Sequence, residues 1–147
     1  LQDHIKACKR YNIAPDIPRY GEGREAGLQR YCTAENGFRV GRQGYRYQGI
    51  CPAGMETSFV GAFERGARLH RIELDIASVK QDRNGLQRDL RDDETYKDLT
   101  EAEKRDRRLE LSRQIRRLER EIRKLEREKD REIFASEQYL LRVAPET

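Results

Sequence analysis

The chain has 147 residues, of which 35% are hydrophobic and 39% are charged. Such a low apolar share excludes one large core and suits one domain or two small ones. The sequence contains no apolar run of roughly 18 residues, the length that a membrane-spanning helix requires. No segment is therefore expected to cross a membrane.

The formal net charge of +4 raises the question of an anionic partner such as nucleic acid. Residues 1–58 contain nine Lys and Arg against six Asp and Glu, whereas residues 59–147 contain 22 against 21. The second part is nearly neutral, and its arginines alternate with acids as on a solvent-exposed helix face. This pattern is unlike a phosphate-binding stripe, so a nucleic-acid partner is not expected.

Composition changes sharply along the chain. Ten of the 11 glycines, five of the seven tyrosines and all three cysteines precede residue 67. We therefore predict a small Cys-, Gly- and Tyr-rich α+β domain over residues 1–58 and a long, charged helical hairpin over residues 59–147. The expected fold class is mainly α.

Two short helices are predicted at the start of the small domain. The first covers His4–Tyr11, and Asn12–Pro18 follows as a turn, because each proline disfavours helix at the residue before it. The second covers Tyr20–Tyr31, whose apolar residues fall on one face. Gly23 and Gly27 on this helix are expected to permit close backbone approach to a neighbour.

A short β-hairpin is predicted after the second helix. Asn36–Gly37 is a turn signal, and the segments Phe38–Val40 and Tyr45–Tyr47 each alternate apolar or aromatic residues with arginine. Gly41–Gly44 would form the turn between these two strands. Two strands alone are marginally stable, so the neighbouring helices would have to cover one face.

The remainder of the chain has the spacing of two long helices, at about residues 55–91 and 100–136. Thr100 and Glu103 form a capping box that begins the second helix. Two helices of similar length joined by a short loop are expected to fold back on each other as an antiparallel coiled-coil hairpin. Its apolar seam comprises Phe59, Phe63, Leu69, Ile72, Ile76, Val79, Leu86 and Leu90 from the first helix and Leu111, Ile115, Leu118, Ile122 and Leu125 from the second.

Glycine, tyrosine and cysteine residues in the first half recur at spacings that resemble a known family. The pattern is Tyr20-x-x-Gly23-Arg24-x-x-Gly27-Leu28-x-x-Tyr31-Cys32, Asn36-Gly37-Phe38, Gly41-x-x-Gly44-x-x-Tyr47-x-Gly49-x-Cys51-Pro52 and Phe59-x-x-x-Phe63-x-x-Gly66. Over about residues 4–70 the chain thus resembles uncharacterised proteobacterial lipoproteins, the domain of unknown function family 2799.

The resemblance implies a location but no activity. Such proteins look like bacterial cell-envelope lipoproteins, with a signal peptide and a lipidated cysteine upstream of the domain. The resemblance thus implies a periplasmic chain that meets a membrane, such as the outer membrane, only through a lipid anchor upstream of Leu1.

Three cysteines in a short exported domain predict one disulfide and one free thiol. Cys32 and Cys51 are the preferred pair, because they end the second helix and precede the first long one. Their bond would close a loop of 18 residues and stabilise the domain by about 3 kcal/mol. Pairing of Cys8 with either of them stays open, since connectivity cannot be read from sequence.

A metal-binding or redox role is the main alternative. His4 and Cys8 would share a face of the first helix, and with Cys32 and Cys51 they could form a tetrahedral zinc site. Their spacing is unlike paired CxxC motifs, and a buried Cys8 beside a structural His4 is the simpler interpretation. A Cys–His nucleophile pair would need an orienting third group, and none is recognisable. We expect no cofactor and no enzymatic activity.

Aromatic and basic residues of the small domain form a candidate interaction surface, because tyrosine and arginine provide rigid amphipathic contact area. The alternative is that the tyrosines fill a core that is short of aliphatic side chains, with their hydroxyls at its edge. The candidate residues are Tyr20, Arg24, Tyr31, Arg39, Arg42, Tyr45, Arg46 and Tyr47.

These patterns predict a protein-interaction or scaffolding module of the cell envelope. The expected partner is another envelope protein, bound through the candidate surface. The thin core of a two-helix hairpin makes self-association along the long helices a second possibility.

Overall fold

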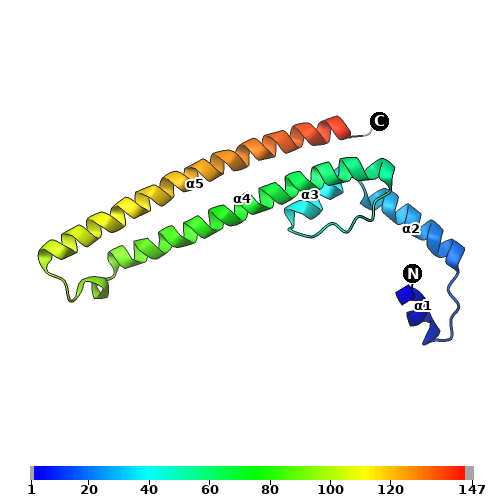
Figure 1. Ribbon diagram of the computed structural model, residues 1–147, viewed down its shortest axis with the longest axis horizontal. Helices are drawn as coiled ribbons and strands as arrows, with labels where there is room; N and C mark the ends of the chain where they lie inside the picture. Colours follow the sequence, from blue (N-terminus) through cyan, green and yellow to red (C-terminus); the bar gives the residue numbers. More distant parts are fainter. Residues whose placement is uncertain (1, 145–147) are drawn as a thin grey trace.

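The computed structural model describes residues 2–144, and all regular structure in that range is helical. Figure 1 shows two long antiparallel helices, a short helix against one of them, and two helices beyond its end. The predicted mainly α class is confirmed. In chain order the elements are α1 (Gln2–Lys9), α2 (Ile17–Tyr31), α3 (Ala34–Arg42), α4 (Ala53–Arg91), the 3-10 helix η1 (Asp93–Tyr96) and α5 (Glu101–Val143).

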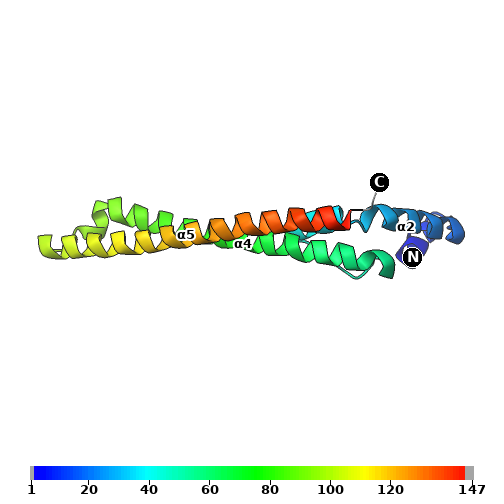
Figure 2. The same ribbon diagram turned by 90° about the horizontal axis from the view of Figure 1, so that it is seen from above.

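Helices α4 and α5 form an antiparallel pair, which we call the arm. They lie side by side in Figure 1 and cross at a shallow angle in Figure 2. Within residues 2–144, no helix combines the length and apolar character needed to span a membrane. The seam residues farthest from solvent are Leu69, Ile72 and Ile76 on α4 and Leu111, Ile115 and Ile122 on α5.

Phe59, near the start of α4, is also fully buried, whereas the other predicted seam residues are only partly buried, because a pair of helices shields one side of each. Val79, Leu86 and Leu90 on α4 are half-buried, as are Leu118 and Leu125 on α5. The arm therefore has a narrow apolar core along its length, as the spacing predicts.

The ends of the long helices lie close to the predicted positions, with one difference. The capping box of α5 is present, since the Thr100 backbone N–H donates to the Glu103 carboxylate at 2.8 Å and the Thr100 hydroxyl accepts from the Glu103 backbone N–H. α5 continues beyond the predicted end near residue 136, where the Tyr139 hydroxyl donates to the Ser58 carbonyl oxygen at 3.4 Å. The division of the chain at residue 58, within α4, stays a prediction.

Tyr96 closes the far end of the arm. It lies in η1, between the two long helices, and only 2% of its surface is exposed. Its hydroxyl donates to the Leu90 carbonyl oxygen at 3.3 Å, and the Arg108 guanidinium lies 4.8 Å above its ring. The tyrosine thus covers the end of the apolar seam and receives a cation–π contact from α5.

The predicted β-hairpin is wrong. Residues 34–42 form helix α3, and residues 43–50 contain no strand. Thr33 caps the helix, because its hydroxyl oxygen accepts a hydrogen bond from the Asn36 backbone N–H at 3.2 Å. The alternation over Phe38–Val40 is too short to distinguish a strand from a helix.

Helix α3 packs on α4 through a close contact between their backbones. Gly37 and Gly41 lie on one face of α3 and are buried. A Cβ atom at Gly41 would collide with the Phe63 carbonyl oxygen, and one at Gly66 would collide with the Phe38 carbonyl oxygen. Positions without side chains on both helices allow this approach. The glycines that suggested a turn therefore form the packing face of a helix.

Helix α2 makes no such close backbone contact, and only its last turn packs on the core, through Leu28 and Tyr31. None of its residues is buried, and a Cβ atom at Gly23 or Gly27 would meet nothing within 4 Å. The predicted close approach at these two glycines is therefore wrong. α1 contacts α2 through His4 and Tyr20, whose ring centroids are 5.1 Å apart, and both helices extend beyond the end of the arm (Figure 1).

The glycine contact predicts opposite effects for two alanine substitutions. Gly41→Ala should lower the free energy of unfolding by about 1–3 kcal/mol, because the new methyl group overlaps the Phe63 carbonyl oxygen. Gly27→Ala, in the open part of α2, should raise it or leave it unchanged, since alanine favours helix by about 1 kcal/mol. Urea denaturation followed by circular dichroism measures both. Equal stabilities for the two variants would contradict the close contact.

Candidate functional site

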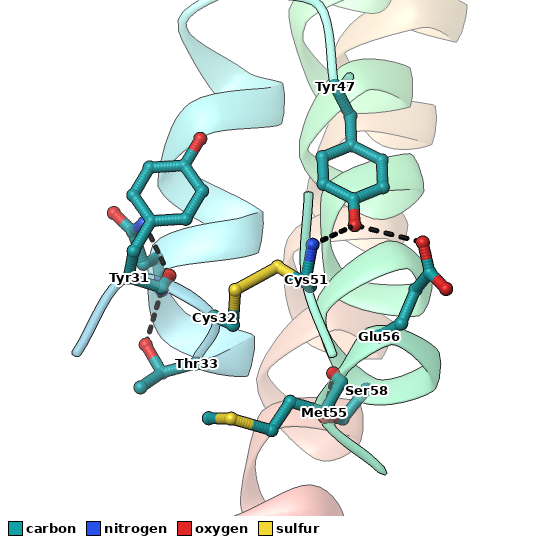
Figure 3. The surroundings of a disulfide bond; sticks show 9 residues. Tyr31, Cys32, Thr33, Tyr47, Cys51, Met55, Glu56 and Ser58 are labelled. Atoms are coloured by element: carbon teal, nitrogen blue, oxygen red, sulfur yellow. Dashed lines mark hydrogen bonds between the residues drawn. A yellow bond between two sulfur atoms is a disulfide. The ribbon is translucent and has the colours of Figure 1, made fainter. Parts of the chain in front are cut away.

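Cys32 and Cys51 form a disulfide with their Cα atoms 5.6 Å apart, which confirms the preferred pairing (Figure 3). Cys32 is the C-cap of α2, and Cys51 lies shortly before α4. Both are buried. The bond closes a loop that contains all of α3 and holds the start of this helix near the start of α4.

An aromatic cluster lies beside the disulfide. Phe59 is fully buried, and the rings of Tyr31 and Tyr47 pack on it with centroid distances of 5.4 and 4.9 Å. Tyr47 also contacts Phe63 at 6.1 Å. Tyr31 and Tyr47 thus occupy the core of the small domain, the alternative considered for the tyrosines in the sequence.

The Tyr47 hydroxyl makes two hydrogen bonds across this core. It accepts from the Cys51 backbone N–H at 2.9 Å and donates to Glu56 Oε1 at 3.0 Å (Figure 3). Burial raises the pKa of Tyr47 above its usual value of 10.0; the hydrogen bond from Cys51 opposes this rise, and the Glu56 carboxylate adds to it. The hydroxyl therefore joins the loop of residues 43–50 to the first turn of α4.

The proposed metal ligands are not brought together. Cys32 and Cys51 are bonded to each other, and Cys8 is a free, partly buried thiol on α1. His4 packs against Tyr20. Across residues 2–144, no group of three or more His, Cys, Asp or Glu side chains could hold a metal ion. The geometry gives no support to the zinc alternative.

The other candidate surface residues lie on separate elements. Arg24 is exposed on α2, and Tyr20 is occupied by its contact with His4. Arg42 on α3 forms an ion pair with Glu73 of α4 at 2.9 Å. Tyr45 and Arg46 are exposed in the loop after α3. The predicted surface is thus divided between α2 and the region around α3.

Two adjoining hollows flank α3, and together we call them the α3 groove. Their volumes are about 440 and 550 Å³. Tyr31, Asn36 and Arg39 line both. The first hollow is lined in addition by Gly27, Arg30, Thr33 and Glu35, and the second by Val40, Gln43, Tyr45, Arg46, Gln48 and Ile50.

Asn36 fixes the position of Arg39 at the centre of this groove. The buried Asn36 amide donates to the Tyr31 carbonyl oxygen at 2.7 Å. Its Oδ1 accepts from Arg39 Nε at 3.2 Å and from Arg39 Nη2 at 2.5 Å. The sequence interpretation missed this role, because it assigned Asn36 to a turn. It also missed Arg30, which lines the first hollow together with Arg39 because of how α2 meets α3.

The disulfide predicts a specific loss of stability on its removal. The double variant Cys32→Ser, Cys51→Ser should unfold at lower urea concentration, with a free energy of unfolding reduced by about 3 kcal/mol, because the unfolded chain regains the freedom of the closed loop. Cys8→Ser, which leaves the disulfide intact, is the matched control and should unfold like the parent chain. A double variant as stable as the control would contradict a structural role of the bond.

The raised pKa of Tyr47 predicts a pH dependence of stability. The fold favours the neutral phenol, so this contribution is complete below about pH 10 and is lost as pH rises through the higher folded-state value. Urea denaturation of the parent chain and of Tyr47→Phe over a series of pH values tests this. Near neutral pH the free energy of unfolding of the parent should exceed that of Tyr47→Phe by about 1 kcal/mol. This difference should shrink above pH 10. Tyr45→Phe, at an exposed ring, should match the parent near neutral pH.

Comparison with curated proteins and with solved structures found no match. The comparison with protein families gave one result for the part of the chain that contains the disulfide, the aromatic cluster and the α3 groove. Residues 1–68 match the family described as Protein of unknown function (DUF2799), and this match confirms the resemblance inferred from the glycine, tyrosine and cysteine spacings.

Proposed function

We propose that the chain is a protein-interaction or scaffolding module of the bacterial cell envelope. In this role the small domain recognises a partner protein, and the arm sets the distance between that contact and other components. The proposal places the chain in the periplasm, attached to a membrane through a lipid anchor upstream of Leu1.

One observation supports this role of the small domain above the others: Arg39, which lines both hollows of the α3 groove, is held in place by Asn36 and forms no ion pair among residues 2–144, whereas a few charges of the arm pair across its two helices. On the arm, Glu132 of α5 lies 3.2 Å from Arg68 and 3.7 Å from Arg65 of α4, and Lys80 of α4 lies 2.9 Å from Glu126 of α5. Such pairs contribute little stability at a surface, but they satisfy each other. An unpaired arginine remains free to bind a partner.

Self-association through the arm is the second candidate. Leu74 is exposed over 55% of its surface at mid-arm, and Phe134 over 63% near the end of α5. Leu74 lies between two acidic residues, and single exposed apolar residues of this kind are common on protein surfaces. Among nearby exposed apolar residues, Phe134 shares a face of α5 only with Leu141, which is exposed over 73% of its surface. These residues are weaker support for an interface on the arm than the unpaired Arg39 is for an interface at the α3 groove.

The proposal predicts where a partner can be cross-linked in cells that produce the full-length protein. A photo-reactive amino acid at Tyr45, exposed over 64% of its surface beside the groove, should give an adduct with a different protein. The same amino acid at Leu74 is the matched control and should give none. Mass spectrometry of membrane and periplasmic fractions identifies the adducts.

Each other result of this experiment has a definite meaning. An adduct of two copies at Leu74 would favour self-association through the arm. Absence of adducts at both positions, in cells that contain the folded protein, would contradict an interaction role. Recovery of the protein from the cytoplasm alone would contradict the envelope location.

A further inference from the structure

Arg39 is a cation whose position is fixed but whose charge is not neutralised. Arg39 Nε and Nη2 both donate hydrogen bonds to Asn36 Oδ1, which is an uncharged acceptor. Among the ion pairs formed by residues 2–144, none includes Arg39. The guanidinium thus retains its full charge and has N–H groups left for a ligand.

Arg42 provides an internal comparison. It lies one turn later on the same helix and is similarly exposed, but Glu73 of α4 accepts its hydrogen bond at 2.9 Å. The guanidinium of Arg42 is therefore already paired with a carboxylate, whereas no carboxylate of residues 2–144 pairs with Arg39.

The surroundings of Arg39 reinforce its charge. Arg30 lines the first hollow of the α3 groove and Arg46 lines the second, and neither forms an ion pair among the described residues. Glu35 is the one acid in the lining. Three arginines against one glutamate make the groove attractive to an anion.

Apolar side chains stand beside these cations in the second hollow. Tyr45 is exposed over 64% of its surface and Ile50 over 41%, and both line this hollow together with Val40. Exposed aromatic and aliphatic surface next to an oriented arginine is the combination found in protein-binding hot spots.

We propose that the α3 groove binds a short acidic segment of the partner protein. Arg39 takes a carboxylate of that segment, and a neighbouring apolar side chain packs on Tyr45 and Ile50. This inference rests on the proposed interaction function and names the chemistry of its partner.

The arrangement favours a peptide over a phosphate group or a membrane. Arg30 and Arg46 line different hollows on the two sides of Arg39, so the three arginines are spread along the groove and do not surround one point. A phosphate is best held by several donors that converge on it. A peptide segment with spaced carboxylates and an apolar residue can pair with the separated arginines and also pack on the apolar side chains of the second hollow.

Peptide selection tests the inference directly. Random peptides displayed on phage are selected on the full chain, after depletion on the Arg39→Gln variant. The enriched peptides should contain Asp or Glu next to an aromatic or aliphatic residue. Enriched peptides without acidic residues, or no enrichment beyond that on Arg39→Gln, would overturn the proposal.

Affinity measurements with one enriched, fluorescently labelled peptide then compare matched variants. Arg39→Gln should weaken binding by about tenfold or more, and Arg42→Gln by less than about twofold, because the Arg42 charge is already paired. Arg39→Lys keeps the charge but loses the fork of N–H donors, and should give an intermediate loss. Equal losses of affinity for Arg39→Gln and Arg42→Gln, in variants that melt like the parent, would show that only the net charge matters. That result would overturn the assignment of the carboxylate to Arg39.

Two further probes separate this inference from its rivals and from the proposed function. The peptide with its acids replaced by Asn and Gln should not bind. Arg39-dependent binding of vesicles containing phosphatidylglycerol, with no acidic peptide enriched, would assign the groove to a lipid surface instead. A partner that is cross-linked at Tyr45 equally in the parent and in Arg39→Gln would leave the interaction function standing and overturn the acidic-segment inference.

Discussion

The close contact between the backbones of α3 and α4 is the constraint on which the small domain depends. A helix as short as α3 is not stable alone in water, and its two buried glycines lower its helix propensity further. The approach of Gly41 to the Phe63 carbonyl offsets this cost, because it brings the helices close enough to bury Val40 and the aromatic cluster. The disulfide then fixes the connection at the start of α3. These two features position the residues of α3 that line the groove, Asn36 and Arg39 among them.

Polar residues help to specify how α4 and α5 are aligned in the arm. Ser136 on α5 is fully buried, and its hydroxyl donates to Glu132 at 3.4 Å. Glu132 in turn pairs with Arg65 and Arg68 of α4. A shift of α5 by one turn would separate these partners while leaving many apolar contacts possible. Their contribution is therefore greater for alignment than for stability, since half-exposed pairs are weak.

The sequence was sufficient for features that depend on local chemistry or on long periodicity. The seam of the arm and the capping box at Thr100 belong to this class. The pair Cys32–Cys51 was the preferred one from sequence, and the structure was needed to exclude Cys8 from it. The sequence failed at α3, because Asn36–Gly37 has the composition of a turn, and the contact of Gly37 with the Phe59 carbonyl of α4, which favours the helix, is not local in the sequence. The role of Asn36 in orienting Arg39 was missed for the same reason, since it exists only once the helix has formed.

The loop of residues 43–50 links this architecture to the groove. At its start Gly44 adopts a φ of 75° that favours glycine, and it lies against the His70 side chain of α4. At its end the Tyr47 hydroxyl donates to Glu56 in the first turn of α4, and the adjoining Cys51 is bonded to Cys32 at the end of α2. Tyr45 and its neighbours are thus exposed on a segment that is held at both ends. A binding surface ordered before the partner arrives loses less conformational entropy on binding than a free loop would. For this reason the interactions that stabilise the small domain also prepare the side chains with which it would bind an acidic segment.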